Sequence, residues 1–148
     1  MWTRSTITFA REVTDGFQDV VKIYQQYDGY PEDVGRKLAK WLLAKKICNG
    51  FNNEFNMSDA NGACDLAAQY VRDFKKGVGD FYIYPIDIPN EEFDYNYRVM
   101  VRYSDKPLAD CDELVTITIK RFAEQDPIFT GNPSQLLAFC LGLENKYV

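Results

Sequence analysis

The residues best suited to chemistry lie in one short segment, YDGYPED, at positions 27–33. Its three carboxylates could gather as a cation site or a general-acid site, because carboxylates bind hard cations and transfer protons. Acidic residues also stabilise the positive end of a helix dipole, and for these carboxylates we expect that role. Tyrosine is well suited to carrying binding energy at an interface. The candidate binding surface comprises Tyr27, Asp28, Tyr30, Glu32 and Asp33.

Other catalytic chemistry is restricted, because histidine is absent from all 148 residues. Its absence removes the commonest general base and metal ligand, and with them every Ser–His or Cys–His catalytic pair. The cysteines are widely spaced without a C-x-x-C pair, so the sequence predicts free thiols and indicates neither a disulfide framework nor a zinc site. We therefore expect no catalytic residue, no metal and no cofactor. The four cysteines are Cys48, Cys64, Cys111 and Cys140.

Two further patterns resemble nucleotide- or RNA-binding signatures but lack the required context. GVGD at 77–80 precedes a predicted strand, whereas phosphate-binding glycines follow a strand and open a helix. YNYRVMVRY at 95–103 interleaves tyrosines and arginines, but the period of two places them on opposite faces of a strand. A net charge of −5 also opposes nucleic-acid binding and is compatible with a basic protein partner.

The composition is typical of one globular domain spanning residues 1–148, with 46% hydrophobic and 26% charged residues. No apolar run approaches the roughly 18 residues that a membrane span needs. The first ten residues, MWTRSTITFA, lack the long apolar core of a signal peptide. We therefore expect a cytoplasmic location without membrane association.

The candidate surface joins a predicted β-hairpin to a predicted helix. Strands at 3–10 and 18–27 flank the turn TDG, and Asp28-Gly29 ends the second strand, with the glycine expected at positive φ. Pro31 suits the first turn of a helix, and Gly50 is placed to end it. The Asn- and Gly-rich segment 49–62 is predicted to be an exposed, mobile connection.

A second helix is predicted at about 62–76, with Leu66, Tyr70 and Phe74 on its buried face and Asp73 on its solvent side. Strands follow at 80–88, 94–104 and 113–122, and a short last helix begins at Pro133 with Asn132 as N-cap. The order ββααβββα predicts an α+β fold. We expect an antiparallel sheet of about five strands, with two longer helices and a short C-terminal helix.

Several segments follow the pattern of a known family, namely TRSTITF, YDGYP, NGACDLAAQ, FKKG and IFTG. Over nearly its whole length the chain resembles a family of small single-domain proteins found in bacteria and their phages. The resemblance transfers no activity, because the family has no agreed catalytic residues. Family members commonly have a histidine near the DGYP turn and another near the end of the second helix. The corresponding segments here, PEDVGRK and VRDFKKG, have none, which favours a binding role.

Two functions remain open. The first is a non-enzymatic protein-binding module, whose acidic loops and surface tyrosines form the contact surface. The phage association implied by the resemblance suggests an accessory protein that binds and inhibits a host factor or defence complex, in the manner of an anti-CRISPR protein. The second is a small-molecule or nucleotide-binding protein, or a weak hydrolase, with a site near Tyr27, Asp28 and Tyr30. In a thermal-shift panel, a ligand at 100-fold its Kd adds about 2.7 kcal/mol of stability.

Overall fold

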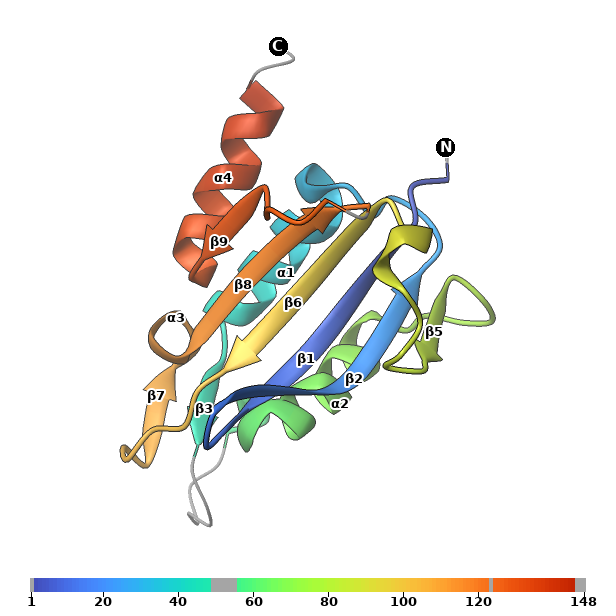
Figure 1. Cartoon of the computed structure of the whole chain (residues 1–148). Helices are drawn as coiled ribbons and strands as arrows, with labels where there is room; N and C mark the ends of the chain where they lie inside the picture. The colour runs from blue at the N-terminus through green and yellow to red at the C-terminus, as the bar shows by residue number, and fades with distance from the viewer. Residues whose placement is uncertain (1, 49–55, 123, 146–148) are drawn as a thin grey trace.

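The computed structural model describes residues 2–48, 56–122 and 124–145. Within these residues the chain forms an α+β fold with a six-stranded and a three-stranded sheet (Figure 1), which confirms the predicted fold class. The larger sheet has the order β5-β2-β1-β6-β8-β9. Its strands are β1 (Ser5–Val13), β2 (Gly16–Gln25), β5 (Phe81–Tyr84), β6 (Tyr95–Val101), β8 (Val115–Arg121) and β9 (Phe129–Gly131).

The smaller sheet and the helices complete the described fold. The smaller sheet has the order β4-β3-β7 and consists of β3 (Lys46–Cys48), β4 (Asp59–Ala60) and β7 (Leu108–Asp110). A π-helical turn, η1 (Pro31–Gly35), continues directly into α1, and a 3-10 turn, η2 (Asn90–Glu92), precedes β6. The α-helices of the described residues are α1 (Arg36–Leu43), α2 (Gly62–Phe74), α3 (Cys111–Leu114) and α4 (Pro133–Asn145).

The larger sheet is not the antiparallel sheet of about five strands that the sequence predicted. It has six strands, and its central pair, β1 and β6, runs parallel, with Ser5 opposite Tyr95 and Arg11 opposite Val101. Parallel neighbours need a long crossover connection, and residues 14–94 provide it here. The period-two pattern identified β1 and β6 as strands, but it carries no information on which strand lies beside which.

The helices cover one face of the larger sheet, and the core lies between them (Figure 1). Leu66 and Tyr70 of α2 are buried, and Phe74 packs partly buried against them, which confirms the predicted face of this helix. A Cβ at Gly35 would lie 3.0 Å from the Cys140 Sγ, so η1 and α4 approach closely. Buried side chains of the sheet include Ile7, Phe9, Ile23, Tyr97, Val99, Ile117 and Ile119.

Several predicted element boundaries are wrong. The first helix ends at Leu43, well before Gly50, because residues 46–48 pair with β7 as strand β3. The strand predicted at 80–88 ends at Tyr84, because Pro85 has no N–H to donate to a neighbouring strand. Of the connection predicted at 49–62, residues 49–55 lie outside the described residues. Its described part contains the short strand β4.

The other face of the larger sheet is polar and is crossed by residues 85–93, which we call the strap (Figure 1). Asn96 was expected on the solvent face, but only 6% of it is exposed. Its Nδ2 donates to the carbonyl oxygen of Asn90 at 2.9 Å, and the hydroxyl of Thr6 donates to its Oδ1 at 2.7 Å. The strap therefore shields one end of the polar face from solvent.

Helix α4 begins as the sequence predicted, although it is longer than expected. The backbone N–H of Gln135 donates to Asn132 Oδ1 at 2.8 Å, and the backbone N–H of Asn132 donates to Gln135 Oε1 at 2.9 Å. This reciprocal arrangement satisfies N–H groups that a helix start otherwise leaves without partners. None of the helices in the described residues is both long and apolar enough to cross a membrane.

Candidate functional site

The YDGYP segment connects β2 to η1 and is anchored at Gly29. The Gly29 N–H donates to the Thr3 carbonyl oxygen at 2.9 Å, and the buried Tyr97 hydroxyl donates to the Gly29 carbonyl oxygen at 2.7 Å. A Cβ at position 29 would lie 2.5 Å from the Ser5 Cβ. The expected positive φ lies at Asp28, where φ is 56°, and Gly29 is required instead for its close approach to β1.

The acidic residues of the candidate surface surround Tyr30. The pKa of the Tyr30 hydroxyl is raised, first by burial and then by the charges of Asp28, Asp33 and Glu32. Asp33 also pairs with Lys37 at 2.8 Å. The described residues contain no group of three or more His, Cys, Asp or Glu side chains that could hold a metal ion. These carboxylates therefore lie within electrostatic range of one hydroxyl, in a segment whose acidic residues outnumber its basic ones.

Beside this segment lies a group of exposed aromatic side chains, Trp2, Tyr27 and Phe122, which we call the aromatic patch. The rings of Trp2 and Tyr27 pack edge to face with centroids 5.5 Å apart. Trp2 and Phe122 line the same shallow pocket. The exposed fractions are 64% for Trp2, 40% for Tyr27 and 47% for Phe122. Exposed aromatic residues that lie close together are typical of binding surfaces.

Phe122 directly follows β8 and has a backbone φ of 50°. A non-glycine residue in this left-handed conformation costs about 1–2 kcal/mol. Its N–H donates to the carbonyl oxygen of Asp94 at 3.2 Å, which fixes the chain at this bend. About half of this residue remains exposed in the strained conformation. Strained residues of this kind are concentrated at functional sites.

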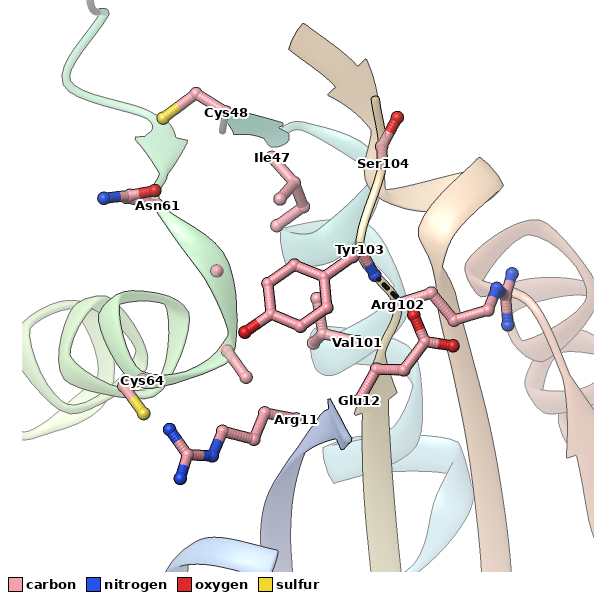
Figure 2. Close-up of a pocket in the computed structure, with 12 residues that line it drawn as sticks. Arg11, Glu12, Ile47, Cys48, Asn61, Cys64, Val101, Arg102, Tyr103 and Ser104 are labelled. Atoms are coloured by element: carbon pink, nitrogen blue, oxygen red, sulfur yellow. Dashed lines mark hydrogen bonds between the residues drawn. The ribbon is translucent and has the colours of Figure 1, made fainter. Parts of the chain in front are cut away.

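A separate cavity of about 250 Å³ lies where the carboxyl ends of the parallel strands β1 and β6 meet the start of α2 (Figure 2). We call it the end cavity. Figure 2 shows the Tyr103 ring projecting into the space between β3 and α2, with Arg11 on the same side. Strand β6 ends at Val101, and the side chain of Tyr103 beyond it is exposed.

The polar groups of the end cavity are largely engaged within the protein. The backbone N–H of Tyr103 donates to Glu12 Oε1 at 3.0 Å (Figure 2). At the start of α2, the backbone N–H of Asn61 donates to a carboxylate oxygen of Asp65 at 2.8 Å. The backbone N–H groups at a helix start commonly bind anions. Here the Asp65 carboxylate already accepts one of the N–H groups at the start of α2. Arg11, Arg102 and Glu12 also line the end cavity, which therefore offers binding volume beside charges of both signs.

The Cys48 thiol at the end cavity is not an activated nucleophile. The pKa of Cys48 is raised, first by burial and then by the charge of Asp59, so its thiol stays protonated at neutral pH. Cys64 is exposed at the start of α2. All four cysteines of the chain are free thiols, as the sequence predicted. A thiol that remains protonated and has no histidine beside it lacks the activation that nucleophilic catalysis requires.

A second group of polar side chains surrounds the buried Lys45. Its ammonium donates to Gln69 Oε1 at 2.7 Å and lies 4.6 Å from the centroid of the Trp41 ring. Asp73 Oδ2 lies 3.8 Å from the same ammonium and accepts the Trp41 Nε1–H at 2.8 Å. The pKa of Lys45 is lowered by burial and raised in part by Asp73. These contacts make Lys45 a satisfied structural cation.

Replacing Asp73 with alanine is expected to destabilise the fold by about 2 kcal/mol, because the Trp41 N–H loses its partner and the buried Lys45 its counter-charge. The sequence had placed this carboxylate on the solvent side, where the expected cost is only about 0.5 kcal/mol. Urea unfolding at neutral pH measures the difference. Asp105→Ala is the control, because it removes an exposed carboxylate without an ion pair in the described residues.

The Asp73 carboxylate should also make the free energy of unfolding depend on pH in the acidic range. Hydrogen bonds from Arg72 and Trp41 lower the pKa of Asp73 from 3.8 to about 2. A carboxyl group with a lowered pKa in the folded state stabilises the fold above its unfolded pKa. This stabilisation is lost as the pH falls through the folded pKa. The stability difference between the wild type and Asp73→Asn should therefore shrink as the pH falls from about 3.8 to about 2. A constant difference across that range would contradict the assignment.

Comparisons with known proteins found no matching family model, and neither a curated protein nor a solved structure is significantly similar to the chain. The family resemblance and the functions it implies therefore remain hypotheses. Two cavities of about 360 Å³ are lined by side chains other than Tyr27, Asp28 and Tyr30. The end cavity is also lined by other residues. The small-molecule site predicted at those three residues thus gains no support from a cavity.

Proposed function

We propose that this protein is a non-enzymatic protein-binding module and that the aromatic patch forms the centre of its contact surface. The observation that carries the proposal is the exposure of Trp2, Tyr27 and Phe122 beside one another. Tryptophan and tyrosine are enriched among the residues that contribute most to binding energy at interfaces. None of the three rings is needed to fill the core.

The charge around the patch favours a basic partner. Tyr30 lies three residues after Tyr27 in the chain. The charges of Asp28, Glu32 and Asp33 act on its hydroxyl. The whole chain carries a net charge of −5. Acidic groups at the rim of an interface increase the association rate with a positively charged surface. The partner that best fits this surface is a protein with an apolar pocket for the aromatic rings and basic residues around it.

The most concrete form of the proposal is a phage-type accessory protein that binds and inhibits a host factor or defence complex. The resemblance of TRSTITF, YDGYP and NGACDLAAQ to a family of bacterial and phage proteins supports this form. Binding alone can inhibit a complex by covering a surface that it needs. This mode of action requires no catalytic residue in the inhibitor.

Phe122→Asn tests whether the patch binds or only packs. Asparagine tolerates positive φ better than phenylalanine does, so the stability of the free protein should stay the same or rise by up to about 1 kcal/mol. Affinity for a partner isolated from bacterial lysate should fall at least about tenfold, because an aromatic anchor is lost. Thermal unfolding and titration of the isolated partner measure the two effects.

Tyr103→Asn is the matched control, because it also removes an exposed ring, at the opposite end of β6. It should leave binding unchanged. Trp2→Ala should reduce binding as Phe122→Asn does. If Phe122→Asn and Tyr103→Asn bind the partner equally well, the patch is not the contact surface.

A further inference from the structure

A cavity of about 360 Å³ lies on the polar face of the larger sheet, beside the strap. We call it the strap cavity. It shares no residue with the aromatic patch. Its floor is formed by side chains of the sheet, and Ile86 and Ile88 of the strap form an apolar wall. Its volume falls in the range of pockets that hold small molecules.

The strand register places cationic and hydroxyl side chains side by side on this floor. Thr8 of β1 lies opposite Lys22 of β2 and opposite Arg98 of β6, and Arg98 in turn lies opposite Thr118 of β8. These four residues therefore form one row across four neighbouring strands. Lys120 of β8 belongs to the next row, opposite Asn96. Side chains in such rows share one face of the sheet and point into the same space.

Lys22 is the unusual member of this row. Only 4% of it is exposed, and its ammonium donates to the Ile88 carbonyl oxygen at 2.8 Å and to Asn90 Oδ1 at 3.3 Å. No carboxylate in the described part of the chain lies within ion-pair distance of this ammonium. Lysine is almost never fully buried without a counter-charge. Lys45, the other buried lysine, has Asp73 at 3.8 Å.

The other charged side chains around the cavity carry both signs. Arg98 is neutralised by Asp19, which it contacts at 2.8 Å. Lys120 makes no ion pair with the described residues, so two ammonium groups, those of Lys22 and Lys120, lack a direct counter-ion. Glu91, on the strap, opposes an anion, and the charges of Asp19 and Asp87 also act on Lys22, so the positive charge of the cavity is partly offset.

We propose that the strap cavity binds a small molecule that carries a phosphate group. A phosphate monoester has a charge close to −2 at neutral pH, so its oxygens can pair with the two ammonium groups that have no ion-pair partner in the described residues. Its oxygens accept charge-assisted hydrogen bonds from Lys22 and Lys120, and the hydroxyls of Thr8 and Thr118 supply further donors. The organic part of the ligand packs against Ile86 and Ile88. This site goes beyond the proposed protein-binding function and does not depend on it.

The test is an NMR titration of the whole chain with adenosine 5′-monophosphate, inorganic phosphate and adenosine. Adenosine 5′-monophosphate should bind saturably and shift the backbone amides of Thr8, Lys22, Arg98 and Thr118. Inorganic phosphate should shift the same amides at higher concentrations, and adenosine should not. Lys120→Gln should weaken binding at least about tenfold, because one charge-assisted contact is lost.

Lys46→Gln is the matched control, because it makes the same change at an exposed strand lysine of the smaller sheet, and it should leave the affinity unchanged. Lys22→Met should abolish binding, and its far-UV circular dichroism reports whether the variant is folded. If the Lys22→Met variant is unfolded, the affinity of the Lys120→Gln variant alone decides whether the proposal holds. The proposal is overturned if neither phosphate compound binds saturably at millimolar concentration, or if Lys120→Gln and Lys46→Gln bind alike. Tight binding of an oligothymidylate without binding of the mononucleotide would also overturn it, in favour of a nucleic-acid surface.

Discussion

Leu66→Asp is expected to leave the chain unfolded at room temperature. Leu66 is completely buried in the core between α2 and the larger sheet. An aspartate there must either bury an unpaired charge or open the core to water, and it also removes the packing of the leucine. The cost should exceed about 4 kcal/mol, a large fraction of the total stability of a domain of this size. Far-UV circular dichroism and urea unfolding measure the effect.

Ala68→Asp provides the matched control, since it introduces the same residue two positions away on the exposed side of α2. Its expected cost is about 0.7 kcal/mol, from helix propensity alone. Two variants of equal stability would show that α2 packs through a different face from the one described.

Gly29→Val is expected to destabilise the fold by about 3 kcal/mol, because it overpacks a closely fitted contact. The new Cβ would lie 2.5 Å from the Ser5 Cβ and 2.9 Å from the Thr3 carbonyl oxygen, and the second of these neighbours is backbone. Relief requires the loop to move away from β1. That movement breaks the hydrogen bond from the Gly29 N–H to Thr3 and the one from the Tyr97 hydroxyl to the Gly29 carbonyl. Chemical denaturation of the purified variant gives the cost.

Gly77→Val separates this steric effect from the general effect of replacing a glycine. Gly77 is exposed, and a Cβ built there meets no atom within 4 Å. Its replacement should change stability by less than about 1 kcal/mol. Equal destabilisation by both variants would mean that the approach of the YDGYP segment to β1 is looser than the structure shows.

Only part of the candidate site could be predicted from the sequence. The segment at 27–33 was identified because its turn residues and its acidic helix start are local signals. Tyr27 indeed belongs to the aromatic patch, and the carboxylates surround Tyr30. Trp2 and Phe122 were missed, because nothing near position 27 indicates that a residue three positions before β1 and the residue after β8 lie near it. Two aromatic residues placed at strand ends were the only available signal.

The burial of Lys22 could not be predicted from the sequence either. Its strand was predicted, and the period of two would place it on the polar face. Its burial, however, depends on the strap, which lies more than sixty residues further along the chain and was predicted to be the end of a strand. A counter-ion cannot be judged missing until the side chains around the lysine are known.

The sequence by itself determined the local elements and the class of the fold, because helix and strand periodicity, caps and turn residues act within a few neighbouring residues. It thereby located the hairpin, the buried face of α2, the Asn132 cap and the polar face of the strand that became β6. Only the tertiary structure decided that β6 lies parallel to β1, that short segments form a second sheet, and that Gly29 is needed for space. These outcomes depend on contacts between residues far apart in the chain, and such contacts are set by the packing of the whole core.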